Sequence, residues 1–284
     1  MNKIVYQTLR ILPDKAYIKL QYWYVTRRKL NLKNPTRYNE KLQWLKLYDR
    51  KPEYSVYVDK YRVKKYIADT IGSRYVIPTL GIWDSADEID LNELPEQFVL
   101  KCNHDSKSVC ICKDKKTFDF DAAKKKLNTK LRLNQFAYGR EWPYKNVEPL
   151  ILAEKYMEDE SGGLQDYKVL CFNGQPKLIQ LHRGRFTEEY TQDFYDVNWN
   201  RQDFNQKGEK MAELPAPQPE FLKEMLELSA RLSKGIPHIR VDWYYAEHQL
   251  YFGELTFFDA AGYDEFVPDE YNGILGSWIE LPKK

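Results

Sequence analysis

Residues 239–259, IRVDWYYAEHQLYFGELTFFD, have the pattern of a β-hairpin: two runs rich in aromatic and β-branched residues flank a polar turn near Glu247 and His248. Side chains alternate between the two faces of a strand, so Arg240 and Asp242 share one face of the first run. On the return run, the same alternation predicts one shared face for Leu250, Phe252, Glu254 and Thr256. The hairpin therefore carries acidic side chains on faces that are otherwise rich in aromatic residues.

Asp242 and Glu254 face each other directly if the turn has three residues centred on His248. Opposed carboxylates about 5 Å apart repel each other and destabilise a sheet. A divalent cation between them would remove that repulsion, and carboxylate oxygens suit Mg²⁺, which completes its shell with water and phosphate oxygens. A turn of two or four residues would break this register. The alternative is that both acids lie on the solvated face of an ordinary hairpin.

The composition is that of a globular protein. The chain has 284 residues, of which 43% are hydrophobic and 30% charged, and this length is sufficient for one large domain or two lobes with their own cores. Helical and strand patterns are mixed along the chain, so we predict an α+β fold and not a doubly wound parallel sheet. The expected helices cover 38–48, 58–70, 120–135 and 220–233, and the expected strands cover 75–77, 80–83, 97–103, 109–113, 151–157, 167–173 and 177–181.

Charge is concentrated at the start of the chain. The net charge of +2 gives no general argument for nucleic-acid binding. Residues 1–33, however, contain eight Lys and Arg side chains and a single acid, Asp14, interleaved with aromatic residues. Such a segment predicts either peripheral contact with an anionic membrane or an N-terminal helix that packs on its own domain.

Other features favour a cytoplasmic location. No signal peptide is evident, and no apolar run approaches the ~20 residues of a membrane span. The four cysteines, Cys102, Cys110, Cys112 and Cys171, lack the spacing of a zinc site, so buried thiols in a reducing compartment are expected. Only four histidines are present, which disfavours a His-based metal site.

Two further segments contain polar residues suited to a nucleotide. Lys101 projects from the apolar run FVLKCNH, and the polar turn that follows, with Ser106 and Ser108, could cradle phosphate oxygens with its backbone N–H groups. In ILAEKYM, Glu154 can accept from an adenine amino group, and the main chain at Tyr156 and Met157 can donate to a ring nitrogen. The alternatives are a solvent-facing lysine and a strand that ends at the surface.

The order of these segments resembles the ATP-grasp superfamily, and within it the teichuronopeptide-biosynthesis-like ATP-grasp family of bacterial surface-polysaccharide pathways. The resemblance covers nearly the whole chain. It is carried by the sequence blocks NPTRYNEKLQWLKLYDR, DKYRVKKYIADTIGSRYVIPTLGIWD, FVLKCNHDS, ILAEKYM, DYKVLCFNGQPKLIQ, HIRVDWYY and FGELTFFDAAGYDEFVPDEYNGILGSWIEL. It implies two α+β lobes that clasp ATP, with a helical extension at 1–56, an N-terminal lobe at 57–153 and a C-terminal lobe with the metal-binding hairpin at 154–284.

The resemblance also implies roles for individual residues. Lys60 and Lys101 would bind phosphates, Asp166 and Lys168 would point toward the ribose and phosphates, and Arg240 could steady the transferring γ-phosphoryl group. The adenine would contact Glu154 and Met157. Mg²⁺ would be held by Asp242, Glu254 and Thr256. Thr256 stands where many ATP-grasp enzymes have Asn, and Lys107 lies in a loop that usually contains glycine. As carboxylate or phosphate clamps we predict Arg183, Arg185 and Arg201, although an arginine in a loop is often only solvated.

The resemblance predicts ATP-dependent carboxylate–amine ligation through an acyl phosphate. The expected partners are a small-molecule or glycan carboxylate, such as a uronic acid, and an amino acid or amine, with ATP and Mg²⁺ as cofactors. The alternatives are a glycosyltransferase of the same pathways, a kinase that uses the same ATP site, and a non-catalytic ATP-binding protein.

Overall fold

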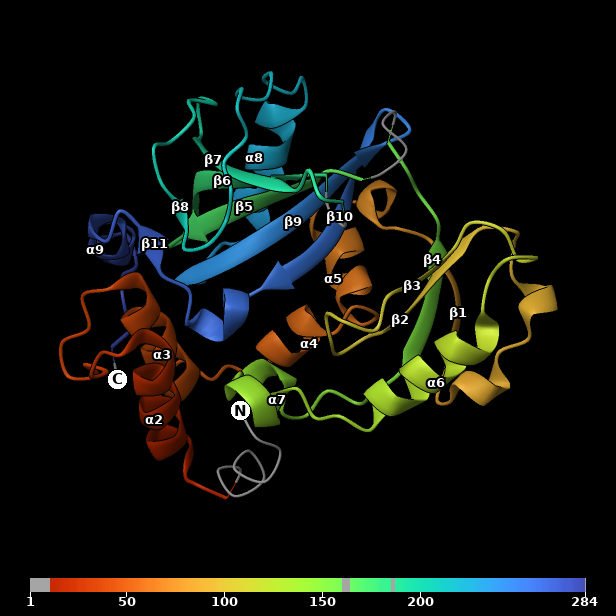
Figure 1. The fold of residues 1–284 in the computed structure, drawn as a ribbon, viewed down its shortest axis with the longest axis horizontal. Coiled ribbons are helices and arrows are strands. Elements are labelled where there is room, and N and C mark those ends of the chain that lie inside the picture. Colours follow the sequence, from red (N-terminus) through yellow and green to blue (C-terminus); the bar gives the residue numbers. More distant parts are fainter. Residues whose placement is uncertain (1–10, 160–163, 185–186, 284) are drawn as a thin grey trace.

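The structure is a computed structural model that describes residues 11–159, 164–184 and 187–283. Two antiparallel sheets dominate the described chain and lie side by side in Figure 1, with α4 (Tyr54–Val58) and α5 (Val63–Thr70) between them. This mixture of separate helices and antiparallel sheets confirms the predicted α+β class.

The four-stranded sheet has the strand order β1-β4-β2-β3. Its strands are β1 (Thr79–Trp83), β2 (Phe98–Cys102), β3 (Cys110–Cys112) and β4 (Ile151–Lys155). Helix α6 (Phe120–Leu131) packs on this sheet and closes a small core, which contains Phe98, Leu100 and Leu127. The predicted lobe boundary at residue 154 falls inside β4, so the last two residues of that strand belong to this sheet.

The five-stranded sheet has the order β10-β9-β5-β6-β7. Its strands are β5 (Asp166–Phe172), β6 (Gln175–Arg183), β7 (Thr191–Asp196), β9 (His238–Ala246) and β10 (Gln249–Thr256). Helix α8 (Leu222–Leu232) covers one face, where Trp243 is fully buried and donates to Ser229 at 2.8 Å. A two-stranded ribbon of β8 (Asn205–Gln206) and β11 (Phe266–Val267) lies beside β7 and α9 (Glu270–Ser277).

The remaining helices belong to the N-terminal region and to short connections. Helices α2 (Asp14–Thr26) and α3 (Tyr38–Tyr48) pack together, α3 also contacts α9, and α7 (Phe136–Gly139) follows α6. Tyr17, Ile18 and Tyr22 of α2 are buried in the main core. The predicted helix that packs on its own domain is therefore present. Short 3₁₀ turns cover Ser73–Tyr75, Ala86–Glu88, Leu91–Glu93, Trp142–Tyr144 and Asp259–Gly262.

The β9–β10 hairpin corrects the predicted register. Its turn has two residues, not three, because Glu247 and His248 both have positive φ and Ala246 pairs with Gln249. A β-bulge then places two residues, Gly253 and Glu254, opposite Asp242. Beyond the bulge the pairing is the one that a three-residue turn would have given. The prediction that Leu250, Phe252, Glu254 and Thr256 share one face was also wrong. Because of the bulge, Leu250 and Phe252 lie on the face covered by α8, whereas Thr256 pairs with Arg240 on the other face.

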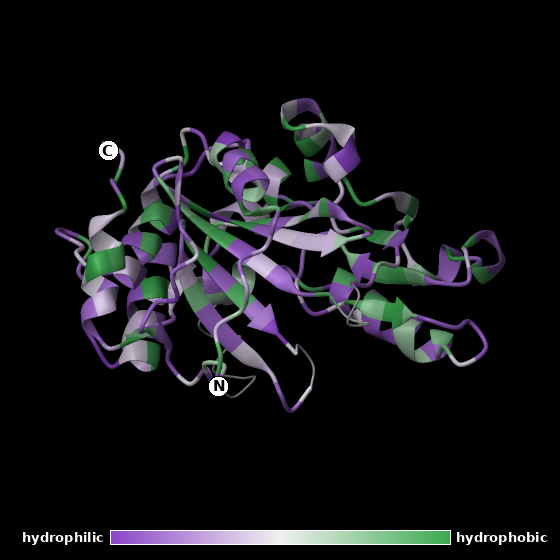
Figure 2. Cartoon of the chain, turned by 90° about the horizontal axis from the view of Figure 1, so that it is seen from above, coloured by the Kyte–Doolittle hydropathy of each residue, from purple (hydrophilic) through white to green (hydrophobic). Residues whose placement is uncertain are grey.

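Two other predicted elements differ from the structure. The expected helix over 58–70 is interrupted because Asp59 accepts from the backbone N–H groups of Tyr61 and Arg62, which ends α4 before α5 begins. Residues 75–77 form no strand, and Val76 makes only an isolated bridge to Phe252. The predicted helix over 38–48 matches α3, and the other predicted strands and helices are present with shifted ends. Figure 2 shows hydrophilic and hydrophobic residues alternating along the strands, the feature on which those predictions depended.

Candidate active site

One face of the five-stranded sheet is polar. Lys168 pairs directly with Asp242 and with Gln180, and paired residues of antiparallel strands share a face, so these three side chains lie together. Arg240 and Thr256 lie on the same face one step along. Figure 1 shows that this region of β9 and β10 lies toward α4, α5 and the four-stranded sheet. The predicted residues of β5, β9 and β10 are thus brought together on one face.

Arg240 is the centre of this face. Its guanidinium contacts both oxygens of Asp242 at 2.7 and 2.8 Å, Glu254 at 3.3 Å and Asp259 at 2.5 Å. It also donates to the Thr256 hydroxyl at 3.2 Å. Burial would lower the pKa of Arg240, but Asp242 and Asp259 outweigh burial and raise that pKa well above its ordinary value. Arg240 is therefore a fixed, permanently charged group.

Asp242 and Glu254 are already neutralised by the side chains of the protein. Lys168 binds Asp242 at 2.6 Å, and Lys60 lies 3.4 Å from Glu254. Burial would raise the pKa of Glu254, but Lys60 and Arg240 outweigh it and hold the pKa well below its usual range. The argument that two facing carboxylates require a metal ion is therefore corrected, because Arg240, Lys168 and Lys60 supply the positive charge.

Of these two carboxylates, Glu254 has the accessibility that a Mg²⁺ ligand needs, whereas both oxygens of Asp242 are bound by Arg240 and Lys168. The contacts of Glu254 with Lys60 and Arg240, at 3.4 and 3.3 Å, are longer than charge-assisted hydrogen bonds of about 2.7–2.9 Å, and its side chain is 28% exposed. Its oxygens are thus accessible for coordination. In residues 11–159, 164–184 and 187–283, no group of three or more His, Cys, Asp and Glu side chains forms a metal site. A cation here would be held by Asp242 and Glu254, with phosphate oxygens and water completing its shell.

On the four-stranded sheet, Lys101 and Glu154 lie on neighbouring strands and form an ion pair. Lys64 of α5 binds the other oxygen of Glu154 at 2.7 Å and also donates to the Ile77 carbonyl and the Thr79 hydroxyl. Burial would raise the pKa of Glu154, but Lys101 and Lys64 outweigh it and keep the carboxyl ionised. Both oxygens of Glu154 thus have lysine partners, and its predicted contact with an adenine amino group stays a prediction.

The loop after β2 connects the two groups of charges. Lys60 donates to the carbonyl of Asp105 at 2.6 Å while its ammonium also faces Glu254 of the other sheet. Ser108 is buried and its hydroxyl contacts Asp105 and the backbone N–H of Cys102, so it stabilises the loop from inside. Ser106 and Lys107 are exposed. Of the two serines predicted to cradle phosphates, only Ser106 is accessible.

An apolar cluster lies where β4 meets the hairpin. Met157 is buried against Ile77, Ala246 and Tyr251. The ring of Tyr156 is partly exposed, and its hydroxyl donates to Glu158 at 2.7 Å. An apolar surface at the end of β4, three residues after Glu154, is the environment that the predicted adenine contact at Met157 requires.

Arg183 and Arg201 are corrected to structural residues. Arg183 binds the fully buried Asp193 at 2.7 Å, and Arg201 binds the same carboxylate at 3.1 Å. Phe194 pairs with Gln180, so Phe194 lies on the polar face of the sheet. Asp193 precedes Phe194 in β7, and successive side chains of a strand alternate between faces, so Asp193 lies on the opposite face. Neither arginine faces Arg240. The third predicted clamp, Arg185, lies outside the described residues.

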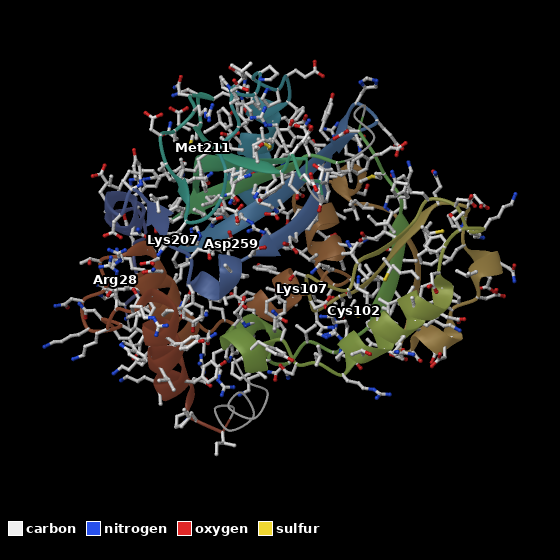
Figure 3. The ribbon with its side chains drawn as sticks, in the orientation of Figure 1. Arg28, Cys102, Lys107, Lys207, Met211 and Asp259 are labelled. Carbon is white, nitrogen blue, oxygen red and sulfur yellow. The ribbon has the colours of Figure 1, made fainter. Side chains whose placement is uncertain are left out.

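Two residues of the site, Asp259 and Lys64, were not predicted from the sequence. Asp259 follows β10 and reaches Arg240, and Figure 3 labels it near the ends of β9 and β10, with Lys107 across from it on the loop after β2. Lys64 lies on α5, whereas Lys60 lies in the turn between α4 and α5, so their four-residue spacing in the sequence is not that of two residues on one helix. Asp166, which was predicted to point toward the ribose and phosphates, lies two residues before Lys168 on β5, and its carboxylate is 3.9 Å from the Lys168 ammonium.

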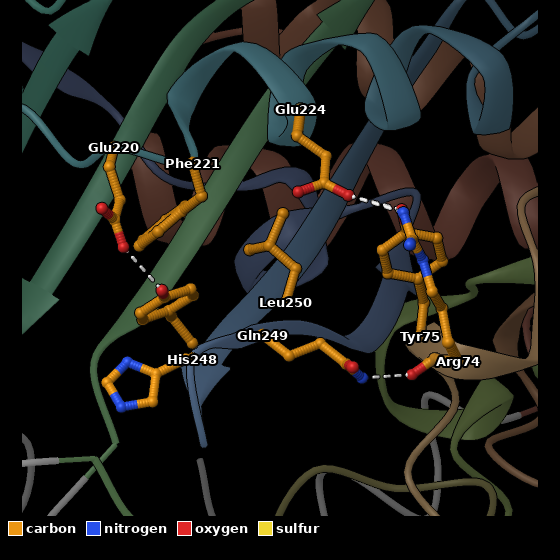
Figure 4. A pocket seen from close by; sticks show the side chains of 9 residues that line it. Arg74, Tyr75, Glu220, Phe221, Glu224, His248, Gln249 and Leu250 are labelled. Atoms are coloured by element: carbon orange, nitrogen blue, oxygen red, sulfur yellow. Dashed lines mark hydrogen bonds and ion pairs between the residues drawn. The ribbon is translucent and has the colours of Figure 1, made fainter.

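A cavity of about 390 Å³ lies away from these residues, between α8 and the hairpin turn (Figure 4). Its polar side chains are largely bound to each other: Glu224 pairs with Arg74, and Glu220 accepts from the Tyr245 hydroxyl. The cavity shares no residue with the polar face around Arg240. The candidate active site is therefore the region between the two sheets.

The sequence matches the family model described as TupA-like ATPgrasp over residues 40–280. The chain belongs to the TupA-like ATP-grasp family. This confirms the resemblance that the sequence blocks carried and, with the α+β architecture, the ATP-grasp fold. ATP-grasp ligases as a class join carboxylates to amines with ATP. No curated protein matches the sequence.

Solved structures with similar folds include two D-alanine–D-alanine ligases. The ligase from Bacillus anthracis complexed with ATP is 16% identical, with a TM-score of 0.42, and the match covers 71% of this chain and 54% of that one. The ligase from Helicobacter pylori is 16% identical, with a TM-score of 0.43, and the match covers 86% and 70%. A RimK domain ATP-grasp protein from Sphaerobacter thermophilus is 11% identical, with a TM-score of 0.43, over 80% and 69%. The chain thus spans about half the length of the first of these.

In the part of the chain that the structure describes, no helix combines the length and the apolar composition needed to cross a bilayer. Peripheral membrane contact through residues 1–33 stays a prediction, and residues 1–10 of that segment lie outside the described residues.

Proposed function

We propose that this protein is an ATP-dependent carboxylate–amine ligase that forms an amide through an acyl phosphate. The carboxylate would be a uronic acid or a related acid of a surface polysaccharide, and the amine an amino acid or another small amine. The observation that carries the proposal is the convergence of Lys60, Lys168 and Arg240 on Asp242 and Glu254, opposite the pair of Lys101 and Glu154.

A carboxylate is a poor electrophile because its oxygen is a poor leaving group. Transfer of the γ-phosphoryl group of ATP to that oxygen makes phosphate the leaving group, and the amine then displaces it. Such a reaction needs positioned positive charge and oriented reactants, and it needs no covalent intermediate on the protein. Lys101 and Lys60 would neutralise the phosphates, and Arg240 would orient the transferring group from its fixed position.

Arg240 can serve in this way because its orientation is set before any ligand binds. Asp242 binds it through two parallel contacts, and Asp259 holds it from the other side at 2.5 Å. Mg²⁺, when bound at Asp242 and Glu254, would supply further charge neutralisation at the phosphates. The 28% exposure of the Glu254 side chain supports the part of this assignment that concerns Glu254.

The test is ATP-dependent trapping of an acyl phosphate. Purified protein is incubated with Mg-ATP, hydroxylamine and a panel of uronic acids, and both ADP and hydroxamate are measured. We expect the two products in equal amounts with an accepted carboxylate, and loss of both in Glu254→Ala. The matched control is Glu220→Ala, a variant of an exposed glutamate at the separate cavity, which should keep the wild-type rate.

The alternatives give different products. Release of a nucleoside diphosphate from a sugar donor without ATP would identify a glycosyltransferase, and a stable phosphorylated alcohol would identify a kinase. ATP binding without ADP release for any acceptor would identify a non-catalytic protein. ADP formation that is unchanged in Glu254→Ala would remove Glu254 from the metal site.

A further inference from the structure

A second cavity, of about 630 Å³, lies in the N-terminal region, formed by α2, the segment after it and the end of α3. Such a volume is within the range of small-ligand pockets, about 300–1,000 Å³. It shares no residue with the candidate active site. Its lining consists of Lys15, Lys19, Lys29, Leu30, Asn31, Leu32, Lys33 and Tyr48.

The four lysines of this cavity are uncompensated. Among the described residues, none of them forms an ion pair with a carboxylate, whereas the nearby Arg28 contacts Glu265 at 3.4 Å. The one acid in residues 1–33, Asp14, is bound by Arg50 at 2.7 Å and also contacts Arg140. Four like charges around one hollow repel each other, and an anionic ligand would remove that repulsion.

The walls of the cavity are fixed by packing. Leu30 and Leu32 are buried in the main core, so Lys29 and Lys33, which alternate with them, are directed outward. Asn31 accepts from the backbone N–H groups of Lys33 and Asn34 and fixes the turn of this segment. The lysine backbones are therefore positioned before a ligand arrives, which lowers the entropic cost of binding.

The chemistry of the lining favours a glycan. Tyr48 is 37% exposed, and its ring packs at 4.9 Å from that of Trp44, so a fixed aromatic face is available for a sugar ring. Lysine ammonium groups are compact charges without the planar geometry of arginine, so they suit a polymer with repeated carboxylates. The four lysines line a hollow in the surface and not a flat face, so they suit an inserted chain more than a bilayer.

We propose that this cavity is a docking site for an acidic glycan chain whose sugar carboxylates pair with Lys15, Lys19, Lys29 and Lys33. The site lies outside the active site and mostly before residue 40, where the match to the family model begins. The inference rests on the proposed function, since the polymer held there would carry the carboxylate that is activated between the two sheets. The docking itself needs neither ATP nor turnover.

The experiment measures binding of a fluorescent oligogalacturonate to the full chain without nucleotide. The test variant is Lys19→Gln/Lys33→Gln, and the matched control is Lys116→Gln/Lys125→Gln, which removes the same charge from exposed lysines elsewhere. We expect binding to be roughly tenfold weaker in the test variant and unchanged in the control, since exposed ion pairs contribute a few-fold each. A neutral maltooligosaccharide of equal length should not bind, and thermal stabilisation by Mg-ATP should be the same in all three proteins.

Equal affinities in the two variants, or no oligogalacturonate binding to wild type, would overturn the proposal. Binding to phosphatidylserine vesicles but not to oligogalacturonate would instead assign the cavity to a membrane surface. The two proposals fail separately. Glycan binding without amide formation refutes only the ligase function. Amide formation with an unchanged KM for the glycan in Lys19→Gln/Lys33→Gln refutes only the docking site.

Discussion

Lys101 and Lys64 both bind Glu154, yet their surroundings predict different effects of substitution: a loss of activity for Lys101 and a loss of stability for Lys64. Lys64 has three acceptors, namely Glu154 and Thr79 at 2.7 and 2.8 Å and the Ile77 carbonyl at 2.7 Å. In the described part of the chain, the ammonium of Lys101 contacts a single acceptor group, that of Glu154. Lys101 can therefore turn to a phosphate while Lys64 keeps Glu154 ionised.

Magnitudes follow from these contacts. Lys64→Met leaves a backbone carbonyl and a hydroxyl without their donor and removes one charged contact, which should cost about 2–4 kcal/mol of unfolding free energy. For a chain of this size the melting temperature should fall by roughly 4–15 °C. Lys101→Met leaves Glu154 paired with Lys64, so the loss of stability should be about 1 kcal/mol. Its turnover should fall by about 10²–10³-fold, as for other preorganised charges aimed at a transition state.

Thermal unfolding with and without Mg-ATP, together with ADP release, separates the two roles. Wild type at about a hundred times its dissociation constant for ATP should be stabilised by roughly 2.7 kcal/mol, and Lys101→Met should lose most of that gain. Lys64→Met should melt earlier but keep a measurable ATP shift. If Lys101→Met retained both the shift and wild-type turnover, Lys101 would not be a phosphate ligand. If the two variants behaved alike, the distinction drawn from their contacts would be wrong.

Three further predictions concern other parts of the molecule. His238 is buried between the Tyr38 hydroxyl and a backbone carbonyl, and burial lowers its pKa to about 4. The unfolded chain therefore binds the proton more readily, so the free energy of unfolding should be highest above pH ~6.5 and fall by up to ~3 kcal/mol toward pH 4. In His238→Gln, the melting temperature should depend less on pH over this range. Asp259→Asn should lower ADP release about tenfold or more by loosening Arg240, with little effect on ATP binding by calorimetry; an unchanged rate would contradict it. A Cβ on Gly276 would lie 2.2 Å from the Thr36 carbonyl oxygen, so Gly276→Ala should lower the free energy of unfolding, measured by urea titration, by about 1–3 kcal/mol. Gly273→Ala in the same helix is the control and should not destabilise, because no atom lies within 4 Å of a Cβ there.

Local signals in the sequence were sufficient for most elements of the fold. Asn173 and Gly174 form the two-residue turn between the predicted strands at 167–173 and 177–181; Asn-Gly is a dipeptide typical of such turns, and both residues adopt the positive φ that the turn requires. The strand β7 was missed because its residues, TQDFYD, show little alternation of hydropathy, although it completes the sheet beside β6. Its inward polar residues are satisfied by tertiary contacts, such as Gln192 with Asn205 at 2.8 Å, which no local pattern contains.

The candidate site shows the same division between local and tertiary information. Spacing on the hairpin identified Asp242 and Glu254, because two acids on aromatic-rich strands are conspicuous in a sequence. It did not identify the source of the compensating charge, since Lys60 and Lys168 come from distant elements. Arg183 was wrongly assigned for a related reason. Its partner, Asp193, lies on the neighbouring strand β7, and this pairing cannot be recognised from the sequence near Arg183.

The β-bulge at Gly253 explains why an incorrect turn length still gave a correct pairing beyond it. The two-residue turn sets a register in which Tyr244 pairs with Tyr251, and the extra residue at the bulge shifts every later pair by one position. Gly253 fits this shift because a Cβ there would lie 3.0 Å from the Tyr244 ring and 3.2 Å from the Asp242 carbonyl oxygen. Without the bulge, strict alternation would place Glu254 on the face of Leu250 and Phe252, away from Arg240. The glycine is thus the residue that moves Glu254 to the polar face, and a two-residue period applied to the sequence could not reveal it.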